Sequence, residues 1–268
     1  MWKRSSLVLV LATATAAALF AHDLFLKLET YFVPPETPIR VAVLNGCFSS
    51  SEGAVTPDRL LDLSVAGPVD RRTVSRDAWK PAGDTTWLTI RTGAPGTYVL
   101  GASLAPREIS LSAEDFNSYL ALDGIPDILE ARTRRGELAR PAQERYHKHV
   151  KAILQVGATR TNAFETRFGY PAELVPLVNP YGLHVGDTLA IRCLVDGQPE
   201  ARQLVIAGGE HDGQAQPERQ ARSDEEGVVR FVLGSTGKWY VKFIHMEPAT
   251  GPGVDYESKW ATLTFEVR

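Results

Sequence analysis

Short segments of β-branched and apolar residues, bounded by glycine, proline and aspartate, run through most of this 268-residue chain. The clearest series lies between about Glu173 and Arg268, where turn signals such as Gly186-Asp187 and Asp196-Gly197 recur. This punctuation is typical of antiparallel strands joined by hairpins. It predicts a small antiparallel sandwich, with strands at Thr188–Val195, Ala201–Ala207, Val228–Leu233, Trp239–His245 and Trp260–Val267.

The same interpretation extends to the rest of the chain. Similar segments at 39–44, 86–90 and 97–100 predict an earlier β region. From Ser112 to about Val156 the signals change to helix, because Ser112 can cap a helix whose third residue is acidic. We therefore expect a mainly β fold with two antiparallel β-sandwich-like regions, the C-terminal one similar to transthyretin or immunoglobulin domains, and a helical insertion between them. The expected boundaries are 22–108 for the N-terminal β region, 109–160 for the helical insertion and 165–268 for the C-terminal sandwich, which includes a polar loop at 208–220.

Residues 1–21 have the features of a secretory signal peptide. Lys3 and Arg4 precede an apolar run, and Ala21 offers a small residue at the cleavage point. The run is shorter than the ~20 residues of a membrane span, so we expect an exported protein that meets the membrane only through the uncleaved leader. Cleavage would remove two positive charges from a formal net charge of −3. An acidic surface argues against nucleic acid as a partner.

Cleavage after Ala21 would make His22 the first residue of the mature protein. A first-position histidine offers its α-amine and its own Nδ1 to one metal ion, and a third nitrogen completes the T-shaped arrangement called a histidine brace. This arrangement suits copper and other metals with a tetragonal preference. Cleavage after Ala18 is the alternative, and it would leave the histidine internal.

Strand alternation offers partners for His22. In the segment 239–245, His245 falls on the same side as the apolar residues. Counting back along the last segment places Asp255 and Glu257 on the matching side, which predicts that His245 and Glu257 are near cross-strand neighbours. These residues could ligate a metal; the alternative is a structural histidine held by a carboxylate. Alternation also starts an inward-facing row at His22, consistent with two converging imidazoles.

Two further histidines are weaker metal candidates. His147 and His149 lie two residues apart, and on the expected helix they would point in different directions, so that one ion could not take both. Of this pair only His149 remains a metal candidate. His211, in the polar loop, is the other weaker candidate. Cys47 and Cys193 are the only cysteines. Separate buried thiols are favoured over a disulfide, and their separation argues against a cysteine-based zinc site.

Several stretches carry a family resemblance, namely Ala21–Leu26, Tyr146–Gly157, Glu173–Pro176 with Asn179-Pro180, Gly186-Asp187, Asp196–Pro199, Ser223–Gly227, Gly237–Trp239, His245-Met246 and Asp255–Phe265. Together they resemble the bacterial periplasmic family called domain of unknown function 4198, which is related to the NikM subunit of nickel and cobalt uptake systems. The resemblance implies a periplasmic β-sandwich with a transition-metal connection, in which the family's recurring residues fall on His22, His245, Asp255, Glu257 and Trp260. NikM presents Met-His at its terminus, whereas this chain would present histidine first, so its ligand set must differ.

We therefore expect a soluble periplasmic metal-binding protein, not an enzyme, that captures or delivers Cu, Ni or Co. His22 and His245 would be ligands, and Glu257 or Asp255 would be a third ligand or a supporting carboxylate. A metal transporter or another envelope protein would be its partner. Two alternatives stay open: a metal-free β-sandwich binding or scaffold module of the cell envelope, and a copper histidine-brace oxidase. Neither a Gly-x-Ser-x-Gly nor a His-Glu-x-x-His motif occurs in the chain.

Overall fold

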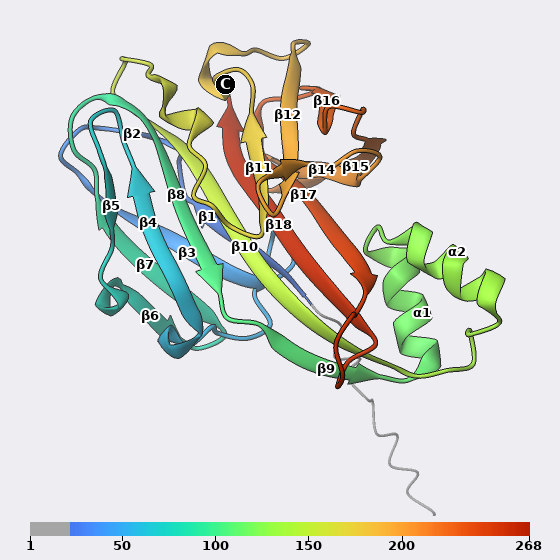
Figure 1. The fold of residues 1–268 in the computed structure, drawn as a ribbon. Coiled ribbons are helices and arrows are strands. Elements are labelled where there is room, and N and C mark those ends of the chain that lie inside the picture. Colours follow the sequence, from blue (N-terminus) through green and yellow to red (C-terminus); the bar gives the residue numbers. More distant parts are fainter. Residues whose placement is uncertain (1–21) are drawn as a thin grey trace, which may run out of the picture.

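The computed structural model describes residues 22–268, so the expected signal peptide and its cleavage point lie outside the described part. A ten-stranded sheet lies at the centre of the fold (Figure 1). Its strands in spatial order are β15 (Gln214–Arg222), β14 (Leu204–His211), β17 (Gly237–Pro248), β18 (Tyr256–Val267), β10 (Ala142–Val156), β8 (Gly96–Leu104), β4 (Leu60–Ala66) and β5 (Arg71–Thr73), with β2 (Phe32–Val33) and β9 (Arg107–Leu111) also paired to β10.

Two smaller sheets cover the central one. The N-terminal sheet contains, in order, β1 (Asp23–Leu28), β3 (Pro38–Gly46), β7 (Thr85–Arg91) and β6 (Trp79–Ala82). The small sheet contains β11 (Ala172–Pro176), β12 (Thr188–Val195), β13 (Gln198–Pro199) and β16 (Val228–Val232). Single 3₁₀ turns occur at η1 (Pro57–Arg59), η2 (Arg76–Ala78), η3 (Asn162–Glu165) and η4 (Pro180–Gly182). The fold is thus mainly β and sandwich-like, as the sequence predicts.

The two smaller sheets lie on opposite faces of the central sheet. On one face, the hydroxyls of Thr262 and Thr264 in β18 donate to carbonyl oxygens of β1, at 2.7 and 2.6 Å. On the other face, the ammonium of Lys151 in β10 forms a fully buried ion pair with Glu173 of β11, at 2.7 Å. Because side chains alternate along a strand, successive residues of β10 and β18 serve different sandwiches. One apolar core cluster runs through both.

The helical insertion is shorter than the sequence predicts. It consists of α1 (Ala113–Leu122), capped by Ser112, and α2 (Pro126–Arg135), which ends at the left-handed Gly136. The expectation of helix up to Val156 is wrong, because residues 142–156 form β10, the strand at the middle of the central sheet. A strand buried on both faces lacks simple alternation, so its apolar residues can mimic a helical stripe.

The helices cover one end of the central sheet. Phe116, Tyr119 and Leu120 of α1 pack with Ile244 of β17 and Trp260 of β18 in a separate apolar cluster. Figure 1 shows both helices beside the ends of β17 and β18. The helices therefore lie on the same face as β1. No helix in residues 22–268 is both long and apolar enough to cross a membrane.

Two smaller expectations also change. The polar segment expected as a loop at 208–220 is a hairpin of β14 and β15 that turns at Asp212 and Gly213. The two thiols are free. Cys193 is buried in β12 as expected, but the expectation of a buried Cys47 is wrong, because Cys47 lies exposed in the turn after β3.

Candidate functional site

A cavity of about 230 Å³ opens where β1 begins. Its lining is rich in groups that can bind cations, and it draws them from distant parts of the chain. The lining residues are His22, Asp23, Phe25, Gly46, Cys47, Phe48, Glu52, Asp123, Glu218, Tyr240 and Lys242. We call this the His22 cavity. It lies between the start of β1, the loop after β3, the end of α1 and the face of β17.

Two contacts fix His22 in this cavity. The imidazole Nε2 lies 3.1 Å from Oε2 of Glu52. The main-chain carbonyl accepts a hydrogen bond from the ammonium of Lys148, which reaches up from β10. A carboxylate beside one ring nitrogen favours the tautomer with the proton on that nitrogen. The contact with Glu52 therefore leaves Nδ1 as the nitrogen whose lone pair can bind a cation.

Lys148 is itself unusual because its ammonium is buried. It also donates to Oδ1 of Asn45 at 3.2 Å, and it lies 5.2 Å from the ring centroid of Trp260. Burial lowers its pKa to about 8. Burial of this charge costs free energy. In return, the ammonium holds the main chain of His22 in one place.

Cys47 brings a thiol to the same cavity. Partial burial acts to raise its pKa, but hydrogen bonds with the hydroxyls of Ser49 and Ser50, at 3.0 and 3.2 Å, lower it to about 7. A thiol with this pKa is substantially ionised at neutral pH. Thiolate is a strong, soft metal ligand.

The carboxylates of the cavity have different partners. Asp23 forms an ion pair with Lys242, and Glu218 accepts a hydrogen bond from the hydroxyl of Tyr240. Burial, and then repulsion by Asp23, raise the pKa of Asp123 to about 6. The cavity therefore places several carboxylates near His22, one of them paired with Lys242.

The other predicted ligands do not join His22. His245 lines a separate cavity of about 180 Å³, with its Nδ1 3.6 Å from Oε1 of Glu200. His245 lies three residues after Lys242 in β17, and side chains alternate along a strand. It therefore points to the face opposite the one where Lys242 pairs with Asp23 of β1. Convergence of the two imidazoles is therefore wrong for this structure.

The predicted carboxylates have other partners. Glu257 lies opposite Glu247 rather than His245, and it binds the guanidinium of Arg145 at 2.8 Å. Asp255 accepts a hydrogen bond from the main-chain N–H of Gln143 at 2.8 Å. Both carboxylates thus stabilise the pairing of the start of β18 with β10.

The weaker histidine candidates are also placed. Nδ1 of His211 lies 3.1 Å from the carbonyl oxygen of Thr236, in the hairpin. Nδ1 of His149 lies 3.0 Å from the hydroxyl of Ser103, and its ring stacks on Tyr170. Burial, and then the neighbouring His147, lower the pKa of His149 to about 3, so this imidazole is neutral at physiological pH.

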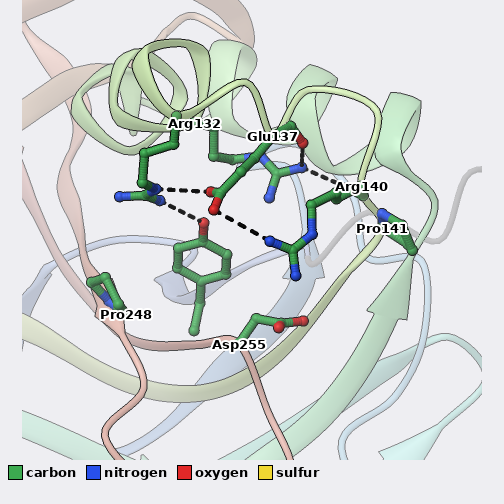
Figure 2. Close-up of a pocket in the computed structure, with 8 residues that line it drawn as sticks. Arg132, Glu137, Arg140, Pro141, Pro248 and Asp255 are labelled. Atoms are coloured by element: carbon green, nitrogen blue, oxygen red, sulfur yellow. Dashed lines mark hydrogen bonds and ion pairs between the residues drawn. The ribbon is translucent and has the colours of Figure 1, made fainter.

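A second polar cavity, of about 210 Å³, is lined by arginines (Figure 2). Arg132 is buried and donates to the carbonyl oxygens of Glu137 and Arg140, at 2.8 and 2.6 Å. The Glu137 carboxylate in turn pairs with Arg135 at 2.9 Å and with Arg140 at 3.4 Å. These groups already satisfy one another, so this cavity is a structural clamp at the end of α2 rather than an anion site.

Sequence reasoning missed most of the His22 cavity. Cys47, Glu52 and Asp123 lie in loops, where no periodicity signals a direction, and only the tertiary fold brings them to β1. Within residues 22–268, no group of three or more His, Cys, Asp and Glu side chains is arranged to hold a metal ion. A brace needs fewer side chains, because its first residue supplies two of the nitrogens.

Comparison with known proteins identifies the family of this chain. The family model described as "Domain of unknown function (DUF4198)" matches residues 19–247. No curated protein matches the chain. The D0-D1 domain of intimin is 10% identical over 91% of this chain and 97% of its own, with a TM-score of 0.20. The human OSCAR ligand-binding domain is 13% identical over 92% and 99%, with a TM-score of 0.20. An Escherichia coli alpha-2-macroglobulin is 9% identical over 92% of this chain and 16% of its own, with a TM-score of 0.22.

Proposed function

The chain belongs to the domain of unknown function 4198 family, and we propose that it is a periplasmic protein that binds one transition-metal ion through His22. The α-amine and Nδ1 of His22 would chelate the ion after cleavage behind Ala21. Copper, nickel or cobalt would be captured or delivered to a metal transporter or another envelope protein.

One observation carries this proposal: the carboxylate of Glu52 lies 3.1 Å from Nε2 of His22. A histidine that ligates a metal almost always has its other ring nitrogen held by a carboxylate, a carbonyl or water. The nitrogen left over is Nδ1, which is the only ring nitrogen that can close a chelate with the α-amine of the same residue. Glu52 therefore favours the tautomer with the proton on Nε2, in which the lone pair of Nδ1 is available for the chelate.

The donor set around His22 supports a third ligand other than His245. Cys47 offers a thiol with a pKa of about 7, and Asp123 offers a carboxylate with a pKa of about 6. Thiolate with nitrogen donors favours copper over the hard cations that prefer oxygen. We therefore propose Cys47 as the third ligand and copper as the preferred ion.

The test compares two proteins that differ only in their first residue. One starts at His22, and the other retains Ala21 in front of it, which keeps the imidazole but moves the free amine out of chelating range. We expect the form starting at His22 to bind one Cu²⁺ per chain, roughly 100-fold more tightly than the extended form, or about 2.7 kcal/mol. Competition titrations against a chelator of known affinity would measure both values.

Side-chain variants complete the design. His22→Ala should abolish tight binding, Cys47→Ser should weaken it, and the matched control His245→Ala should leave it unchanged. Equal copper affinity of the two N-terminal forms would refute the proposal. Secretion to the periplasm with a native start at His22 but no bound metal would favour the metal-free scaffold instead.

A further inference from the structure

His147 and His149 lie on the same face of a strand. Because β10 runs from Ala142 to Val156 as a strand, residues two apart project in the same direction. The two imidazole rings are neighbours, with centroids 6.3 Å apart and planes tilted by 34°. This face is opposite to the one from which Lys148 reaches His22. The pair is therefore independent of the His22 cavity.

His149 carries a polar atom that lacks a partner. Its side chain is buried, with 2% of the residue exposed, and Nε2 makes no hydrogen bond within the described residues. A buried nitrogen without a partner costs free energy unless something fills its lone pair or accepts its proton. The contact of Nδ1 with the Ser103 hydroxyl allows Nδ1–H to donate, which leaves the lone pair on Nε2.

The surroundings hold this ring in a fixed orientation. Tyr170 stacks on His149 with ring centroids 5.7 Å apart, and the Tyr170 hydroxyl is held by Asp62 at 2.6 Å. The imidazole of His147 is half-buried, and it makes no hydrogen bond or ion pair with another described side chain. An ion could therefore reach the buried nitrogen of His149 from the side of His147.

The spacing of the rings indicates the kind of ion. A metal about 2.0–2.1 Å from one nitrogen of each imidazole puts the ring centroids roughly 6 Å apart only when the nitrogen–metal–nitrogen angle is wide. Zn²⁺ in proteins is almost always tetrahedral, whereas monovalent copper accepts two ligands in a nearly straight line. The 6.3 Å separation therefore favours Cu⁺.

Nearby charges are balanced in pairs. Lys259 stands beside His147 in the neighbouring strand and is paired with Asp196. Arg145 is paired with Glu108 and Glu257, at 2.8 Å each. A single positive ion therefore meets little net repulsion at this face.

We propose that His147 and His149 form a second metal site, which binds Cu⁺ between the two imidazoles. The site uses no residue of the His22 cavity. It consists of neutral nitrogen ligands on one rigid strand, with Ser103 and Tyr170 holding the inner ring.

The experiment removes the first site and titrates the second. The protein that retains Ala21 and carries Cys47→Ser is titrated anaerobically with Cu⁺ in competition with a Cu⁺ chelator. We expect one Cu⁺ per chain, and X-ray absorption should show two nitrogen ligands. His147→Asn, at a half-buried position that the fold tolerates, should weaken binding at least tenfold, and so should His149→Gln.

The control is His184→Asn, because His184 is 78% exposed and its Nδ1 lies beside Asp187, in the loop between η4 and β12. It should leave Cu⁺ binding unchanged. Unaltered Cu⁺ affinity in His147→Asn, with the fold intact by circular dichroism, would overturn the proposal. So would an equal loss in His184→Asn. Failure here leaves the Cu²⁺ comparison of the two N-terminal forms unaffected, so the two proposals fail separately.

Discussion

The ammonium of Lys148 donates a hydrogen bond to the carbonyl oxygen of His22, although 126 residues separate them. The contact crosses from the middle of the central sheet to the start of the N-terminal sheet. It ties the position of the residue proposed to bind metal to β10, whose second half is buried. A change at residue 148 should therefore act on metal binding without touching the metal.

Lys148→Met should weaken Cu²⁺ binding by about tenfold or more, as loss of a supporting contact generally does. The free energy of unfolding should change by only about 1–2 kcal/mol, because removal of a costly buried charge offsets the carbonyl left without a donor. Urea unfolding and copper titration measure the two effects. Lys80→Met, at an exposed position of β6, is the control and should alter neither. Unchanged copper affinity in Lys148→Met would contradict this link.

Glu144 should make the protein more stable in mild acid. Burial raises its pKa to about 7, from 4.5 for an ordinary glutamate. The folded chain holds this proton more tightly than the unfolded chain, so the stabilisation is complete below about pH 4.5 and disappears as the pH rises through about 7.

Glu144→Gln removes this titration while keeping an oxygen for the hydroxyls of Ser258 and Tyr119. The variant should exceed the parent in unfolding free energy by about 2–3 kcal/mol at pH 8, and the difference should shrink towards pH 4.5. Denaturant unfolding at a series of pH values gives the difference directly. A difference that stays constant with pH would show that Glu144 does not carry the proton.

Arg132 should be the most sensitive charged residue of the helical insertion. Arg132→Ala removes donors from the carbonyl oxygens of Glu137 and Arg140 and from Oδ1 of Asn117. Leaving buried acceptors unpaired should lower the free energy of unfolding by about 3 kcal/mol. Arg134→Ala on the same helix removes only an exposed pair with Glu130 and should cost about 0.5 kcal/mol or less. Comparable losses in the two variants would be inconsistent with the clamp.

The two thiols should react at very different rates. Cys47 is exposed and has a pKa of about 7, whereas burial raises the pKa of Cys193 well above its usual value. Native protein should therefore couple one maleimide per chain at pH 7, and Cys47→Ser should couple none until it is denatured. Bound Cu²⁺ should slow the reaction of Cys47. Fast labelling of Cys193 in the folded protein would contradict its burial.

Local patterns in the sequence account for much of the fold. Hairpin punctuation correctly predicts β12 at Thr188–Val195, and alternation correctly directs Val241 and Phe243 into the core. The helix cap at Ser112 is also confirmed. These features depend on neighbours a few residues apart, and the sequence displays them directly.

Features that depend on distant partners were not predictable in this way. The strand β10 is covered on both faces, so its apolar residues carry no period that distinguishes strand from helix. Assigning helix there also separated His147 from His149. The pairing of Lys148 with His22, and of Lys151 with Glu173, requires knowledge of which sheets pack together.

The parallel pairing of β10 with β18 has a consequence for how the chain reaches its native state. β10 cannot acquire this neighbour until residues 256–267 have been made, yet β10 is the strand on which both sandwiches depend. Contacts of such long sequence separation slow folding. Assembly of the sheet is thus a late event that awaits the entire polypeptide, and a chain cut off before β18 leaves a long apolar strand open to aggregation.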